Sequence, residues 1–231
     1  MHVFIIESEV AGSTTSVRPT WNTIRSNLQA AGTLGQSMFV DAPTKADLHA
    51  AATAFAAWSG QVPKDDPVVL WLSVHGADPE PGVPDDQRKL VGTSGASSVL
   101  EEVDWEQFLR PVKGASSPRR ITVLMDVCWG SSATAPARLE TPAASRPYMV
   151  FGPVRSAFPA ELALASHAVI GWIAKRGLPL PVDAKSLIDS LNTKCPPSQT
   201  TGTGWYRAWW WNDTGTIQMH PTSTKGKFKR K

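Results

Sequence analysis

Cysteine is scarce in this chain, whose 231 residues include only Cys128 and Cys195. Two cysteines cannot build the disulfide framework of a small secreted domain, so we expect both thiols to be reduced. The five histidines are scattered through the sequence without the spacing of metal ligands. We therefore predict that the protein binds no zinc or other metal and needs no cofactor.

Long apolar runs are also missing. No segment approaches the roughly 20 apolar residues that a membrane-spanning helix needs. The first residues lack the basic, apolar and small-residue pattern of a signal peptide. Together with the reduced thiols, these absences predict a cytoplasmic protein without a membrane span.

Excess charge is confined to the end of the chain. The formal net charge is +3, but five of the 23 basic residues lie in the final TKGKFKRK segment, which leaves 18 against 20 acidic residues. A near-neutral body lacks the electrostatic footprint of a nucleic-acid-binding domain, so we expect nucleic acid as a partner only through the tail. We predict one domain over residues 1–220 and a disordered basic tail over 221–231.

Two apolar stretches of the same design dominate what the chain does contain. One reads DDPVVLWLSVHG (65–76) and the other RRITVLMDVCWG (119–130), and each ends in a reactive side chain close to a glycine. Strands without polar alternation are buried on both faces, which is typical of a parallel sheet between helices. Functional groups gather at the carboxyl ends of such strands, so we expect His75 and Cys128 to lie together if the two strands are neighbours.

Strand and helix patterns alternate through the rest of the chain. Apolar residues at helical spacing predict helices over 19–31, 43–59, 160–176 and 183–194. Further strands are predicted over 1–9, 37–42 and 148–154, with a hairpin over 89–103 and two strands over 204–220. The alternation predicts an α/β fold, with exposed loops over 77–87 and 131–147.

The arrangement of the two stretches resembles the caspase-like cysteine peptidases, the superfamily of caspases, metacaspases, gingipains, separase and CHAT-domain proteases. DVCWG stands where caspases carry a Gln-Ala-Cys-x-Gly run and metacaspases an Asp-x-Cys run. The two motifs lie about fifty residues apart at two predicted strand ends. The resemblance implies a caspase-like α/β fold with a mostly parallel central sheet of about six strands and helices on both faces. It also implies cysteine endopeptidase activity.

The resemblance assigns a role to each motif residue. Cys128 would be the nucleophile and His75 the general base and acid, while the backbone N–H groups of Gly76 and Cys128 would hold the oxyanion. Asp126 would face the same way as Cys128 and bind a substrate side chain, since metacaspases use such an aspartate to select Arg or Lys. A second interpretation of Asp126, hydrogen bonding to neighbouring backbone, stays open. In these interpretations the other cysteine, Cys195, is a loop thiol without a role.

The sequence also bears on other functions. A phosphatase that uses a cysteine needs an arginine six positions later, where this chain has Thr134. His167 fits a partly buried helix position, and the tryptophans at 209–211 fit packing on both faces of a strand better than stacking on bases. The alternative to an enzyme is a catalytically silent caspase-like interaction or sensor module.

The resemblance also implies partners. Small bacterial caspase-like proteases often act in antiviral defence or cell death, which implies a protein substrate such as a gasdermin-like pore former. Because we identify no prodomain or partner domain in the chain, we expect an activating partner or ligand. Caspase-like enzymes often cut themselves after the nucleophile strand, which predicts self-cleavage after Arg138 or Arg146.

Overall fold

The computed structural model describes residues 1–8, 16–76, 89–93, 100–104, 112, 115, 118–128, 146–154, 157–194 and 206–222. Cys195, Arg138, Thr134, the predicted loop over 77–87 and most of that over 131–147 lie outside these residues. So does nearly all of the basic tail. What the sequence predicts for them stays a prediction.

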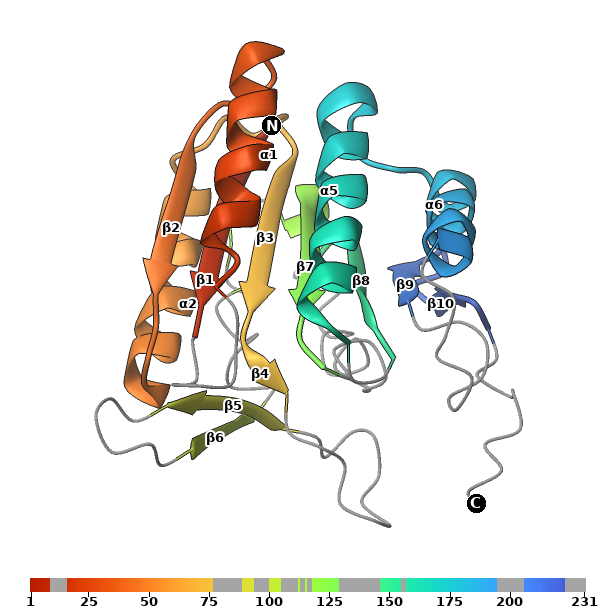
Figure 1. The fold of residues 1–231 in the computed structure, drawn as a ribbon. Coiled ribbons are helices and arrows are strands. Elements are labelled where there is room, and N and C mark those ends of the chain that lie inside the picture. The colour runs from red at the N-terminus through yellow and green to blue at the C-terminus, as the bar shows by residue number, and fades with distance from the viewer. Residues whose placement is uncertain are drawn as a thin grey trace, which may run out of the picture.

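A seven-stranded sheet forms the centre of the described structure (Figure 1). Five strands are parallel, namely β1 (His2–Glu7), β2 (Ser37–Asp41), β3 (Val68–Ser73), β7 (Ile121–Asp126) and β8 (Met149–Pro153). The strands β9 (Tyr206–Trp211) and β10 (Ile217–His220) continue the sheet in antiparallel pairing. The order across the sheet is β10-β9-β8-β7-β3-β1-β2, so the strands that end near His75 and Cys128 are direct neighbours. The predicted mostly parallel α/β sheet is confirmed, with seven strands rather than about six.

A second, three-stranded sheet lies at the carboxyl edge of the first (Figure 1). It consists of β4 (His75–Gly76), β5 (Lys89–Thr93) and β6 (Leu100–Asp104). The pair β5 and β6 confirms the hairpin predicted over 89–103. The sequence predicted that the strand ends at His75. Regular structure continues there instead, because His75 and Gly76 pair with β5.

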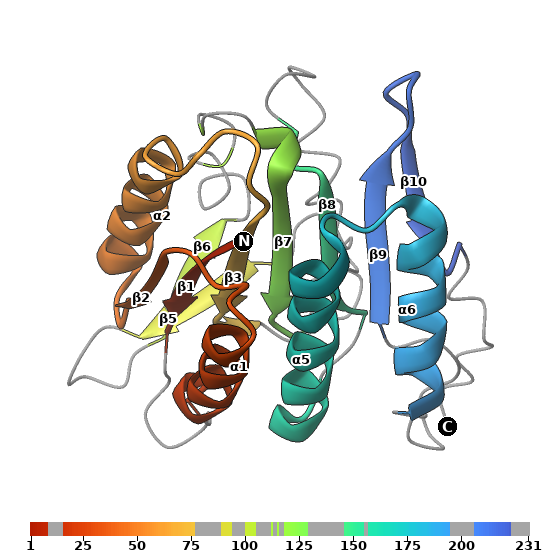
Figure 2. The same ribbon diagram turned by 90° about the horizontal axis from the view of Figure 1, so that it is seen from above.

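Helices cover both faces of the large sheet (Figure 2). On one face lie α1 (Arg18–Ala30), α5 (Pro159–Arg176) and α6 (Pro181–Lys194), and on the other lies α2 (Lys45–Ser59). Local signals set the ends of these helices: Thr44 and Asp47 form a capping box at the start of α2, and Gly177, with a φ of 80°, ends α5. No described helix has both the length and the apolar character that a membrane span requires.

The central strands are buried on both faces, as their unbroken apolar sequences predict. Along β7, Val123 and Met125 belong to the core on the α2 side, whereas Leu124 belongs to the core beneath α1 and α5. The same division separates Trp209 from Trp210 on β9, so the predicted packing of tryptophans on both faces is confirmed. This alternation decides which side chains of β7 face the cavity described below.

Arg120, at the end of the short 3-10 helix η3 (Pro118–Arg120), aligns β7 with the segment that leads into β3. Its guanidinium is buried and donates hydrogen bonds to the carbonyl oxygens of Ser59 (2.6 Å), Val62 (3.3 Å), Pro63 and Asp66 (3.4 Å). These carbonyls belong to the end of α2 and the turn that follows it. One side chain therefore ties the starts of two neighbouring strands together.

Candidate active site

The ends of β3 and β7 place His75 and Cys128 side by side. The last registered pair between these strands is Ser73 with Asp126, and the two candidate residues each lie two positions further on. The backbones are in close contact there, because a Cβ added to Gly76 would overlap the carbonyl oxygen of Cys128. The expected neighbourhood of the two strand ends is thus present.

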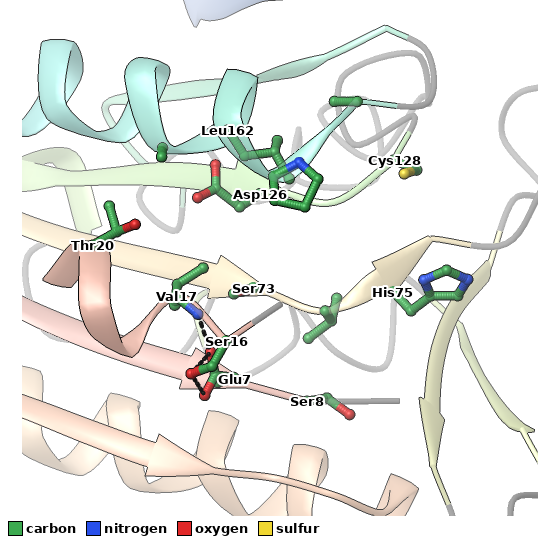
Figure 3. Close-up of a pocket in the computed structure, with 14 residues that line it drawn as sticks. Glu7, Ser8, Ser16, Val17, Thr20, Ser73, His75, Asp126, Cys128 and Leu162 are labelled. Atoms are coloured by element: carbon green, nitrogen blue, oxygen red, sulfur yellow. Dashed lines mark hydrogen bonds between the residues drawn. The ribbon is translucent and has the colours of Figure 1, made fainter. Parts of the chain in front are cut away.

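A cavity of about 170 Å³ opens between these strand ends and the helices α1 and α5 (Figure 3). Its described lining combines a thiol, an imidazole and two carboxyl groups with small and apolar side chains. These residues are Glu7, Ser8, Ser16, Val17, Thr20, Ser73, Val74, His75, Asp126, Cys128, Ala157, Pro159, Leu162 and Ala163. Three of the five parallel strands, β1, β3 and β7, contribute described residues to it.

Cys128 and His75 lie on facing sides of the cavity (Figure 3). Both residues are partly exposed, and the thiol of Cys128 is free. No hydrogen bond joins these two described side chains. An imidazole and a thiol at the same cavity can act as base and nucleophile once a substrate orders them, since such contacts are often loose in the absence of substrate.

Asp126 lies deeper in the structure than Cys128 and is 3% exposed. Its Oδ2 atom is 2.6 Å from the indole Nε1 of Trp71 and 2.6 Å from Oγ of Ser166, while Oδ1 is buried without a hydrogen-bond partner among the described residues. Burial raises the pKa of this carboxyl from 3.8 to about 7, and the hydrogen bonds with Ser166 and Trp71 limit the rise. The hydrogen-bond partners of Asp126 are side chains rather than the neighbouring backbone, which was its second interpretation.

Glu7, at the end of β1, is a cavity residue that the sequence interpretation missed. Its carboxylate accepts hydrogen bonds from Ser16 Oγ (3.1 and 3.0 Å) and from the backbone N–H of Val17 (2.6 Å), which starts α1. Val17 has no side chain that could cap the helix, so Glu7 takes that place. The sequence did contain a signal for Glu7. It is a polar, ionisable residue near the end of an apolar strand, as His75 and Asp126 also are.

The described lining of the cavity contains more acidic than basic side chains. Glu7 and Asp126 line it, and no lysine or arginine is present among its described lining residues. His75 is therefore the one described lining side chain that can carry a positive charge. A cationic group that enters would meet two carboxyl groups and, among the described lining residues, no lysine or arginine.

Two further predictions concern residues outside the cavity. The prediction of a partly buried His167 is wrong, because this side chain is exposed on α5. Its Nδ1 lies 3.1 Å from the carbonyl oxygen of Ala163, and it is not among the described residues that line the cavity. Among the described residues, no group of three or more His, Cys, Asp or Glu side chains could hold a metal ion.

Comparisons with known proteins bear on the fold. No family model matches the sequence, and no curated protein does. The chain is similar in structure to a secreted C11 cysteine protease from Bacteroides thetaiotaomicron, determined in complex with an irreversible peptide inhibitor. The match has a TM-score of 0.59 and 11% sequence identity, and covers 90% of this chain and 65% of that chain. The α/β fold of this chain, with its mostly parallel seven-stranded sheet between helices, is thus a caspase-like fold.

Proposed function

We propose that this protein is a cysteine endopeptidase that uses a dyad of Cys128 and His75. The observation that carries the proposal is the convergence of His75 and Cys128 on one cavity at the ends of adjacent parallel strands, with the backbone of Gly76 in close contact with Cys128. The similar C11 protease, which binds a peptide inhibitor, supports a peptide as the substrate class.

The reaction would proceed by acyl transfer. His75 takes the proton of the Cys128 thiol, and the thiolate attacks the carbonyl carbon of the scissile bond. The oxyanion accepts hydrogen bonds from the backbone N–H groups of Cys128 and Gly76. His75 then protonates the leaving amine, and water hydrolyses the thioester with His75 again as the base. Gly76 suits this site because the close approach of its backbone to Cys128 leaves no room for a Cβ.

The acidic cavity supports specificity for Arg or Lys before the scissile bond. In this proposal Asp126 contacts the cationic side chain, and Glu7 adds negative charge to the same cavity. Oδ1 of Asp126 has no hydrogen-bond partner among the described residues, and it is the atom that a guanidinium or ammonium group would satisfy.

The biological setting follows from the resemblance to small bacterial caspase-like proteases. We propose a partner protein as the substrate, with a gasdermin-like pore former as the first candidate, and a role in antiviral defence or cell death. An activating partner or ligand belongs to the same proposal, as does contact with nucleic acid through the basic tail alone. We further propose that the protein acts in the cytoplasm.

Substitution of the dyad tests the activity. Cys128→Ala and His75→Ala should each lower kcat/KM for peptide hydrolysis by at least about a thousandfold, because each removes a group that takes part in bond making. Both side chains are partly exposed, so the midpoint of thermal unfolding should change little. Cleavage of a peptide library and melting curves measure the two effects, with Cys195→Ala as a control that should keep full activity.

The outcome also separates the enzyme from its alternative. Equal activity of wild-type protein and Cys128→Ala would contradict the dyad. If the wild-type protein never cleaves, and a partner protein binds it and both variants equally, the chain is an interaction module. Labelling of Cys128 by peptidyl electrophiles with a basic residue distinguishes an enzyme that awaits activation from an inert one.

A further inference from the structure

The hydroxyl of Ser166 on α5 lies within hydrogen-bond distance of two acceptors but has a single hydrogen. Its Oγ is 2.6 Å from Asp126 Oδ2 and 2.8 Å from the carbonyl oxygen of Leu162, one turn earlier on the helix. If Asp126 is ionised, the hydroxyl can donate to only one of the two oxygens. If Asp126 is a neutral acid, its own proton is donated to Ser166, and the Ser166 hydrogen remains available for Leu162.

The surroundings of Asp126 also disfavour a negative charge. The carboxyl is 3% exposed, and only one of its two oxygens has hydrogen-bond partners among the described residues. Burying a charge without a counterion is costly, and no described lysine or arginine lines the cavity. Burial accordingly raises the pKa of the carboxyl to about 7.

The other charged and titratable groups among the described lining residues come from three strands or their ends. From β1 comes Glu7, which accepts donors from Ser16 and Val17 and so suits the ionised form. His75 follows β3 and Cys128 follows β7, while the described lining residues of α1 and α5 carry no charge. A single carboxylate, Glu7, is therefore well solvated by donors, and a second like charge in the cavity is opposed.

We propose that Asp126 is a neutral carboxylic acid in the empty enzyme, hydrogen-bonded to Ser166, and that a cationic substrate side chain binds by expelling its proton to solvent. The step is balanced: the acid loses one proton to the buffer, and the resulting carboxylate pairs with the guanidinium or ammonium group. Ser166 is the positioning residue, because it accepts the proton in the empty state and donates to the carboxylate in the bound state. This inference rests on the proposed specificity for basic residues.

The pH dependence of specificity tests the proposal. Two fluorogenic peptides are compared that differ only in Arg or its uncharged isostere citrulline before the scissile bond. The ratio of their kcat/KM values should rise about tenfold per pH unit up to about pH 7 and then level off, since one proton must leave before the cation binds. Titration of His75 and Cys128 affects both peptides equally and cancels in the ratio.

Two variants sharpen the test. Asp126→Asn cannot release a proton, so its ratio should be low and flat with pH. Ser166→Ala removes the hydroxyl that donates to the carboxylate in the bound state, and should shift the rise of the ratio to higher pH, because the hydrogen bond with Ser166 holds the pKa of Asp126 down. A rise at the same pH as in the wild-type protein would overturn the positioning role of Ser166.

The two proposals fail in different ways. A high ratio that does not change with pH overturns the neutral acid and leaves the protease and its specificity intact. If no peptide is cleaved, or Arg is not preferred at any pH, the proposed specificity fails and cation binding by Asp126 fails with it. In that case the protonation state of Asp126 is tested by the pH dependence of the free energy of unfolding alone.

The stability measurement compares wild-type protein with Asp126→Asn in denaturant. The carboxyl has a raised pKa in the folded state, so the folded protein holds a proton that the unfolded chain has lost between about pH 4 and about pH 7. Relative to Asp126→Asn, the free energy of unfolding of the wild-type protein should fall as pH rises through this window. Above about pH 7 the difference between the two proteins should stay constant. The exposed Asp213→Asn serves as the control without such a trend. A constant difference between wild type and Asp126→Asn overturns the neutral acid.

Discussion

Gly76 and Gly171 differ in whether a side chain would fit, because the space next to their Cα atoms differs. At Gly76 an added Cβ would overlap the carbonyl oxygen of Cys128 and come within 2.9 Å of its carbonyl carbon. At Gly171, inside α5, an added Cβ would meet no atom within 4 Å. Gly76 therefore requires the absence of a side chain, and Gly171 does not.

Alanine at these two positions tests this difference. Gly76→Ala should displace the backbone beside Cys128, lower kcat/KM by at least about a hundredfold and reduce stability by about 1–3 kcal/mol. Gly171→Ala should keep the activity and raise stability by up to about 1 kcal/mol, because alanine loses less backbone entropy in a helix. Peptide hydrolysis and chemical denaturation measure both effects. Unchanged activity in Gly76→Ala would contradict the close packing of the two strand ends.

At the scale of secondary-structure elements, the alignment of β3 with β7 depends on the segment between α2 and β3. Arg120, directly before β7, donates hydrogen bonds to three carbonyl oxygens of that segment and to that of Ser59 at the end of α2. Its guanidinium has two terminal nitrogens, and each contacts two of these oxygens, whereas a lysine has one nitrogen from which to donate.

Arg120→Met should therefore destabilise the fold by about 3 kcal/mol, since it leaves buried carbonyl groups without donors. Arg120→Lys should recover only part of this loss. The neighbouring Arg119 is exposed, and Arg119→Met should change the free energy of unfolding by less than about 0.5 kcal/mol. Denaturant unfolding of the three variants is the measurement. Equal stability of Arg120→Met and Arg119→Met would contradict the stabilising role of the Arg120 hydrogen bonds.

For the whole molecule, the question is where the chain can be cut without losing its fold. Self-cleavage after Arg138 or Arg146 is expected from the sequence. Arg146 donates a hydrogen bond from Nη1 to the carbonyl oxygen of Gly215 (3.2 Å), and the bond after it leads to Pro147, whose ring and tertiary amide hinder a protease. We therefore expect the cut after Arg138.

Mass spectrometry of purified wild-type protein should show a break after Arg138, while Cys128→Ala and Arg138→Gln should stay intact. The two fragments should remain associated, because β7 and β8 on either side of the cut pair in one sheet, with Thr122 opposite Met149. Gel filtration before and after denaturation measures this association. A cut in Cys128→Ala would indicate a contaminating protease, and a cut after Arg146 would contradict the protection proposed for it.

Local sequence was sufficient to predict the elements of this fold. Unbroken apolar runs predicted the buried parallel strands, and helical spacing with Pro, Thr and Gly signals predicted the four long helices within a few residues. The position of His75 and Cys128 at strand ends on one edge followed from the same patterns, because parallel strands bring their carboxyl ends together. That the two strands are neighbours was a condition of this prediction, and the order of the sheet meets it. Their catalytic role and that of the Gly76 amide stay predictions.

The tertiary structure alone decided what surrounds those two residues. Glu7 joins the cavity because β1 lies beside β3, and Ser166 reaches Asp126 because α5 packs on β7, across 40 residues of chain. The acidic end of an apolar strand marked Glu7 in the sequence, but its place at this cavity depends on packing between distant elements, as does the contact of Ser166 with Asp126. The charge state of Asp126 depends on that packing too, because desolvation comes from every element around a group and not from its neighbours in the chain.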